Sequence, residues 1–160
     1  MMSAEENLAR LGIVLPPAWR TPAGLNFRTA ARSGNLLFLS GHGPTRPDGT
    51  AMTGRLGDTM TIEEGYEAAR LTALNLLATI RVETGSLDRV RSIVKLLGMV
   101  CCTDEFRDMP RVVNGASDLF VEVFGESGRH ARSAVGMRSL PMGIPVEIEM
   151  IVELQEEGLP

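Results

Sequence analysis

The chain has 160 residues, with 16 basic side chains, 20 acidic side chains and a net charge of −4. A net negative charge, with arginines scattered rather than clustered, argues against a nonspecific grip on nucleic acid and against binding to a membrane surface. Apolar residues make up 44% and charged residues 22% of the chain, as in ordinary globular proteins. We therefore expect a single domain over residues 1–160, in which residues 1–23 form a helix and an irregular extension.

The sequence also predicts the compartment and the absence of a metal. The first residues are acidic where a secretory leader is basic, and no apolar run approaches the length of a membrane span, so we expect a cytoplasmic protein. Cys101 and Cys102 are adjacent, would point to opposite faces of a strand, and suit a reducing compartment. His42 and His130 stand alone, without metal-ligand spacing, so we predict neither a metal nor a cofactor.

The first half of the chain predicts a short helix followed by a hairpin. Ser3 and Glu6 form a capping-box pattern at the start of a helix over about residues 4–12. Proline-rich residues 16–22 are then irregular. Two strands are expected over residues 27–33 and 36–40, joined by the turn at Gly34-Asn35, and a further short strand near residues 50–55.

The second half predicts two long helices and three strands. A second capping box, Thr61 with Glu64, opens a helix that Gly85 ends. A β-rich run over residues 90–103 precedes a helix over about 107–124, and strands follow over about 131–140 and 144–154. The last strand alternates, with Val146, Ile148, Met150 and Val152 on one face and Glu147, Glu149, Ile151 and Glu153 on the other.

Together these elements predict an α+β fold with a mixed sheet of five or six strands. Two long helices can cover only one face of such a sheet, and the other face carries too many apolar side chains to remain in water. We therefore expect a cyclic oligomer in which the uncovered sheet faces meet at the centre.

Arg132 and Glu147 form the candidate site. Arg132 begins one predicted strand and Glu147 follows fifteen residues later in the next. If the two strands are adjacent and antiparallel, these side chains lie close together. A guanidinium binds a planar carboxylate with two hydrogen bonds, and a nearby glutamate can transfer a proton. The alternatives are that Arg132 is a structural strand residue and that Glu147 or Glu149 belongs to a solvated face.

The order of motifs resembles the YjgF/Rid family, also described as L-PSP endoribonuclease-like proteins. The resemblance covers about residues 25–154 and includes Phe38-Leu39-Ser40-Gly41-His42, Gly85-Ser86-Leu87-Asp88-Arg89-Val90, Asn114, Ala131-Arg132-Ser133, Leu140-Pro141 and Val146-Glu147-Ile148-Glu149. The N-terminal helix and the segment Val113-Asn114-Gly115-Ala116-Ser117 look like a long-form subgroup.

The resemblance implies a chorismate mutase-like (bacillar) fold and a homotrimer with a barrel core and ligand clefts between subunits. Active members hydrolyse 2-imino or 2-enamino acids to 2-keto acids and ammonia. By position, Arg132 would bind the substrate carboxylate and Glu147 would position or activate the water. Ser40 and Asn114 lie where the family has pocket-lining or supporting residues.

Three positions depart from the family pattern. Phe27 stands where active deaminases have a tyrosine, Ala134 where a cysteine is usual, and His130 where a proline is common. These residues complete the expected substrate-binding set, which is Arg132, Phe27, Ser40, Asn114, Ala134 and His130. The departures keep a second reading open, in which the cleft binds a keto acid or another carboxylate without turnover.

The remaining alternatives are structural or rest on the family label. Isolated histidines such as His42 and His130 are more often hydrogen-bonded structural residues, Ser40 has no paired base, and Asn114 within a helix could bond only nearby backbone. A ribonuclease reading rests on the family label alone and conflicts with the net charge, the few aromatic residues and the lack of paired histidines.

Overall fold

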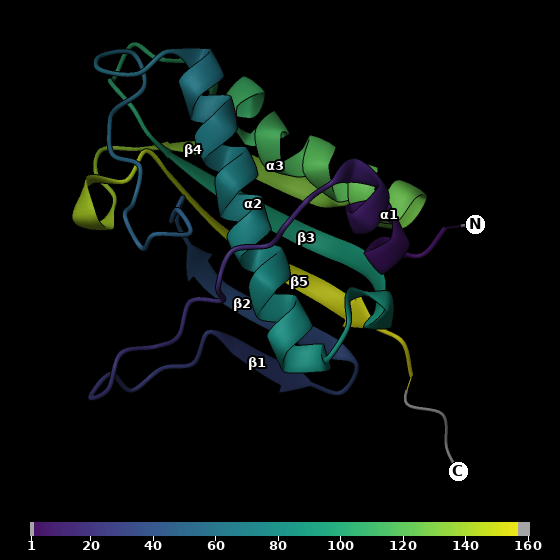
Figure 1. The fold of residues 1–160 in the computed structure, drawn as a ribbon. Helices are drawn as coiled ribbons and strands as arrows, with labels where there is room; N and C mark the ends of the chain where they lie inside the picture. Colours follow the sequence, from purple (N-terminus) through teal and green to yellow (C-terminus); the bar gives the residue numbers. More distant parts are fainter. Residues whose placement is uncertain (1, 157–160) are drawn as a thin grey trace.

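A computed structural model describes residues 2–156, which form one twisted sheet with helices layered on one face (Figure 1). The elements are α1 (Ala4–Leu11), β1 (Ala30–Ser33), β2 (Leu36–His42), α2 (Ile62–Thr84), β3 (Val90–Cys101), α3 (Met109–Phe124), β4 (Ala131–Met137) and β5 (Val146–Leu154). Short 3-10 turns lie at η1 (Leu87–Arg89), η2 (Gly125–Gly128) and η3 (Pro141–Gly143). The ends of the expected 1–160 domain lie outside the described residues. None of the described helices is long and apolar enough to cross a membrane.

The strand order is β1-β2-β5-β3-β4, which confirms the mixed sheet of the α+β fold but not the expected neighbours of β4. β4 pairs in parallel with β3, through the crossover helix α3, and β5 inserts between β2 and β3. The expectation that β4 and β5 are adjacent antiparallel strands is therefore wrong. Residues 138–145 can make this connection because two strand spacings are only about 10 Å, and the segment binds the end of β3 through Cys101 N–H and the Pro145 carbonyl, 2.8 Å apart.

Both predicted capping boxes are present. Ser3 and Thr61 each accept a hydrogen bond from the third helical N–H, and Glu6 and Glu64 accept one in return from the cap backbone. Gly85 ends α2 in the left-handed region, with φ of 81°. These local signals fixed the helix starts because they satisfy backbone N–H groups that have no partner inside the helix.

The core lies between the helix layer and one sheet face. Val146, Ile148, Met150 and Val152 of β5 are buried on this face, as their alternation predicts. The expected strand near residues 50–55 is wrong: in the described chain this region makes only isolated bridges. Asp48 instead accepts hydrogen bonds from the N–H and hydroxyl of Thr50, which closes a turn there. The first predicted strand also begins later, at Ala30.

The N-terminal extension is tied to the body of the protein by Glu5. Its carboxylate accepts two hydrogen bonds from the Arg81 guanidinium, at 3.1 and 2.5 Å, and one from the Leu87 N–H at 2.9 Å. Leu8 is buried in the same core, with 2% of its surface exposed. The chain between α1 and β1 is therefore held at both ends as it passes over the helix layer (Figure 1).

A glycine allows α2 and α3 to approach closely. A Cβ atom on Gly115 of α3 would overlap the carbonyl oxygen of Tyr66 in the backbone of α2. Backbone cannot move aside as a flexible side chain can, so only glycine fits here. This close contact brings the polar face of α3 over the edge of the sheet, where the candidate arginine lies.

We predict that Gly115→Ala lowers the free energy of unfolding by about 1–3 kcal/mol, because the added methyl group pushes the two helices apart. This outweighs the gain in helix propensity of about 1 kcal/mol or less. Urea denaturation measures the change. Glu67→Ala, on the exposed side of α2, is the control and should stay within about 0.5 kcal/mol of wild type. Equal stability of the two variants would contradict the tight contact.

Candidate functional site

Arg132 is held by α3 at the edge of the sheet. Its Nη1 donates to Asn114 Oδ1 at 2.9 Å and to Ser117 Oγ at 3.1 Å, and its Nη2 donates to the Pro110 carbonyl at 3.4 Å. Asn114 and Ser117 are three residues apart, so they project from the same side of the helix. Within the described residues Nε of Arg132 makes no hydrogen bond, which leaves one side of the guanidinium for a ligand.

His130 orients Ser117, which in turn binds Arg132. Its Nδ1 lies 2.7 Å from the Gly128 carbonyl oxygen, and its Nε2 lies 3.0 Å from Ser117 Oγ. A carbonyl only accepts, so Nδ1 carries the proton and Nε2 of the neutral ring accepts from the serine hydroxyl. The lone pairs of Ser117 then face Arg132. The edge-on contact of Phe120 with the imidazole, at 5.9 Å, completes this arrangement.

Glu147 lies on the opposite side of the sheet. The odd-numbered residues of β5 point away from the helices, and Glu147 is half-buried there against the backbone of Gly41, where a Cβ would overlap its carboxylate. Burial raises the pKa of the Glu147 carboxyl, and the nearby Glu149 carboxylate raises it further. No hydrogen bond or ion pair to Glu147 forms among residues 2–156, so its carboxyl group is free to handle a proton.

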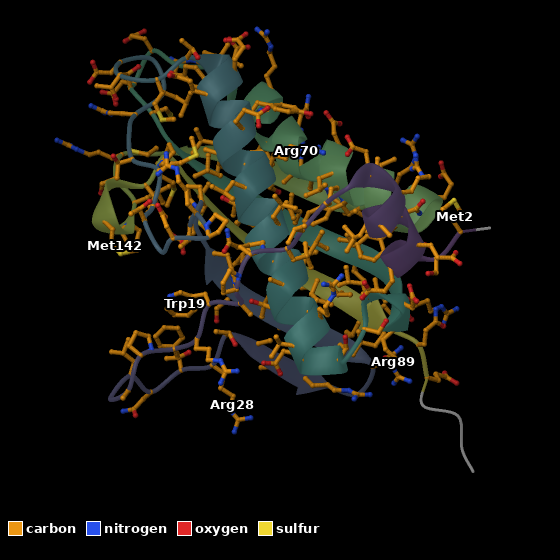
Figure 2. All side chains as sticks on the ribbon, in the orientation of Figure 1. Met2, Trp19, Arg28, Arg70, Arg89 and Met142 are labelled. Atoms are coloured by element: carbon orange, nitrogen blue, oxygen red, sulfur yellow. The ribbon has the colours of Figure 1, made fainter. Side chains whose placement is uncertain are left out.

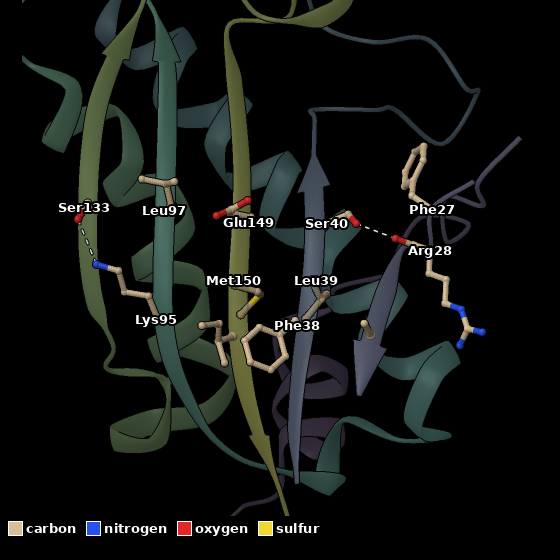
Figure 3. Close-up of a pocket in the computed structure, with 12 residues that line it drawn as sticks. Phe27, Arg28, Phe38, Leu39, Ser40, Lys95, Leu97, Ser133, Glu149 and Met150 are labelled. Carbon is tan, nitrogen blue, oxygen red and sulfur yellow. Dashed lines mark hydrogen bonds between the residues drawn. The ribbon is translucent and has the colours of Figure 1, made fainter. Parts of the chain in front are cut away.

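Phe27 and Ser40 line a large hollow of about 730 Å³ on this uncovered sheet face. Figure 3 shows the hollow with Phe38, Leu97 and Glu149 rising from three strands. Ser40 donates from its hydroxyl to the Arg28 carbonyl at 2.6 Å, which ties β2 to the segment before β1. Phe27 is 48% exposed and its ring stacks on that of Trp19.

The sheet separates Arg132 and Glu147, which we expected from the sequence to lie close together. Arg132 pairs in register with buried Leu96, whereas Glu147 pairs with Met99 on the other face. The expectation that Arg132 and Glu147 lie close together within one chain is therefore wrong. β3 lies between their strands, and the two side chains are on opposite faces of the sheet. Ala134 lies on the helix face opposite Gly98, on the same side as Arg132.

The sequence did not predict the contacts of Ser117 and Trp19. Ser117 stands one helical turn after Asn114, and this spacing was the available signal. Asn114, which could have bonded only nearby backbone, instead accepts from Arg132. Trp19 lies in an irregular segment with no periodicity to mark it.

His42 is structural: its ring nitrogens lie 2.7 Å from the Ser40 carbonyl oxygen and 2.8 Å from Thr79 Oγ1.

These features define a class of protein: a chorismate mutase-like α+β domain with an oriented arginine at one sheet edge and an unpaired glutamate on the open face. The family model "YjgF/chorismate_mutase-like, putative endoribonuclease" matches residues 5–154. Protein TCP17 of Trypanosoma cruzi is 46% identical over 149 residues, which cover 92% of each chain.

Solved structures agree with this match over nearly the whole chain. The protein Atu1372 of unknown function from Agrobacterium tumefaciens is 41% identical with a TM-score of 0.87, covering 95% of this chain and 92% of its own. A Shewanella oneidensis MR-1 protein with the same endoribonuclease designation is 32% identical with a TM-score of 0.89, covering 96% and 100%. The chain therefore belongs to the YjgF/Rid family.

Proton titration should show that His130 is coupled to Arg132. Burial lowers the pKa of His130 and the neighbouring Arg132 charge lowers it further, so Arg132→Ala should raise its midpoint towards the ordinary value of 6.5. The imidazole C–H signals measured by NMR against pH give this midpoint. His42, whose pKa is lowered by burial, is an internal control and should not move.

The same titration has a stability consequence. The native state binds the His130 proton less readily than the unfolded chain does. Its contribution to the free energy of unfolding is therefore present above about pH 6.5 and is lost as pH falls through the lowered pKa. An unchanged His130 midpoint in Arg132→Ala would contradict the coupling.

Proposed function

We propose that this protein forms a homotrimer with clefts between subunits that bind a small carboxylate-bearing metabolite and hydrolyse 2-imino or 2-enamino acids to 2-keto acids and ammonia. The observation that carries the proposal is the guanidinium of Arg132, which Asn114 and Ser117 hold on one side. Its Nε side then offers two parallel N–H groups to a carboxylate, a geometry that an unsupported surface arginine would not keep.

The separation of the two charged residues supports a site between copies. Within one chain the sheet lies between Arg132 and Glu147, so a shared ligand needs the arginine of one copy and the glutamate of another. β4 is an edge strand of the sheet, which leaves Arg132 accessible to a neighbour. The open face has exposed apolar side chains, among them Phe38, 41% exposed, and is the surface through which we expect the copies to associate.

Imine hydrolysis requires few protein groups beyond the Arg132 guanidinium and the Glu147 carboxyl. In imine hydrolysis, a water oxygen bonds to the electrophilic carbon and one water proton passes to a base. The nitrogen gains protons, the C–N bond breaks, and ammonia and a carbonyl remain. Glu147 can accept the proton from water and deliver it to nitrogen, and burial has already shifted its pKa towards the working range. Arg132 contributes orientation of the substrate.

Binding without turnover is the second candidate. Phe27 brings an aromatic ring without a hydroxyl to the open face, and its ring stacks on that of Trp19, with 6.1 Å between centroids. Ala134 brings no thiol. A cleft with fewer polar groups can still bind a keto acid through Arg132, and this would suit a metabolite sensor.

Hydrolysis is tested with imines generated in place from amino acids by an oxidase, following their decay in the presence of the protein. We expect faster decay with wild type, loss of the acceleration in Arg132→Ala, and a decrease of about 10²–10⁴-fold in Glu147→Gln. Arg91→Ala removes an exposed arginine of β3 and should behave as wild type.

The outcome separates the two candidates. Equal decay with and without protein would exclude the deaminase. In that case saturable binding of 2-ketobutyrate, measured by calorimetry and lost in Arg132→Ala but not in Arg91→Ala, would support the binding module. Absence of both decay and binding would contradict both.

Association through the open face is tested by placing a charge on it. Phe38→Glu should convert the trimer into monomers in sedimentation velocity, because each copy would carry an unpaired carboxylate into an apolar contact. Val82→Glu is the matched control, since Val82 is 59% exposed on α2 in the helix layer. A wild-type protein that sediments as a monomer at micromolar concentration would contradict the trimer.

A further inference from the structure

A second, smaller hollow lies beside the Glu147 carboxyl. It has a volume of about 170 Å³ and is walled by the apolar side chains of Trp19, Pro141, Met142 and Ile144. Trp19 comes from the N-terminal extension and Met142 from the turn η3 before β5, and Figure 2 shows both side chains at the same end of the molecule. Two segments far apart in the sequence thus meet beside one acidic group.

Two of the polar side chains that line this hollow, His42 and Asn75, are hydrogen-bonded elsewhere. Both ring nitrogens of His42 are hydrogen-bonded, to the Ser40 carbonyl and to Thr79. The amide nitrogen of Asn75 donates to the carbonyls of Thr45, at 2.8 Å, and Leu71, at 2.9 Å. A polar ligand group would find neither of these side chains unpaired, so the hollow favours a largely apolar occupant, with polarity at Glu147, the Thr45 hydroxyl and the Trp19 indole N–H.

The indole wall is fixed in place. The Trp19 ring stacks on Phe27, with 22° between planes, and its edge meets the His42 ring at 6.3 Å. His42 is buried and bonded at both nitrogens, so it is a rigid support. The Met142 backbone is strained, because Met142 is the one non-glycine residue among those described with a positive φ, 57°. Strain of this kind persists where surrounding structure imposes it.

We propose that this hollow binds the side chain of the substrate, and that the substrate class is 2-imino acids, and their 2-keto products, with a branched or aromatic apolar side chain. This inference rests on the proposed function. The reacting carbon must lie within reach of Glu147, and its side chain is attached directly to that carbon, so the adjoining hollow receives it. A cavity of about 150 Å³ accommodates benzene, and this one matches an isobutyl or benzyl group.

Trp19 is then the residue that determines specificity, and it also reports on binding. It is the only tryptophan of the chain, so a change in tryptophan fluorescence reports on the surroundings of this one indole. We expect 4-methyl-2-oxopentanoate to bind about ten- to a hundredfold more tightly than pyruvate, which lacks the isobutyl group. The larger acid should shift Trp19 emission saturably.

Variants separate the side-chain subsite from the carboxylate contact. Trp19→Ala should bring the affinity ratio of the two acids close to one, whereas Trp19→Phe should keep most of it, both measured by calorimetry. Val14→Ala, at an 88% exposed position of the same extension, should leave the ratio unchanged. Arg132→Ala should weaken both acids alike and keep their ratio. If Trp19→Ala does not fold, Met142→Ala gives the same comparison.

The inference and the proposed function can fail separately. Equal affinity of wild type for the two acids, or an unchanged ratio in Trp19→Ala, would overturn the inference while leaving the carboxylate site intact. If neither acid binds wild type, the proposed function fails, and 3-methylbutanamide then tests the hollow without a carboxylate. A saturable change of Trp19 emission with this amide but not with acetamide would support the apolar subsite, and no change would overturn it.

Discussion

Side chains alternate between the two faces of β5 and of β4, and this alternation decides what one copy of the chain can do. Register with β3 puts Arg132 on the helix side and Glu147 on the open side. A sheet is too thick and too densely packed for two such groups to share a ligand through it. The two groups of the proposed site, the Arg132 guanidinium and the Glu147 carboxyl, are therefore both present in each chain but separated, and only association can combine them.

The parts of the fold that were predictable are those governed by local chemistry. Capping boxes at Ser3 and Thr61 and the alternation of β5 depend on residues close in sequence, and each was found as expected. The position of β5 between β2 and β3 depends on which strand edges are unpaired when the last strand docks. No local pattern carries that information, and a short connection from β4 was compatible with adjacent strands or with strands two apart.

The candidate site shows the same division. Family position identified Asn114 and Arg132, and the structure brings the two side chains within hydrogen-bonding distance. The roles of Ser117 and His130 follow from the backbone turn at Gly128, whose carbonyl determines which imidazole nitrogen carries the proton. Trp19 packs from a segment without regular structure. These contacts depend on tertiary geometry, so residue type and spacing alone could not reveal them.

The loss of polar groups at Phe27 and Ala134 is consistent with an apolar substrate. A tyrosine hydroxyl or a thiol in the cleft would need a partner once the cleft excludes water, and an apolar side chain of the ligand offers none. Here the Phe27 ring instead stacks on that of Trp19. Burial also keeps Glu147 poorly solvated, which raises its pKa in the direction that proton transfer near neutrality requires. If the proposed function holds, the same apolar surface both selects the substrate side chain and raises the pKa of the acid beside it.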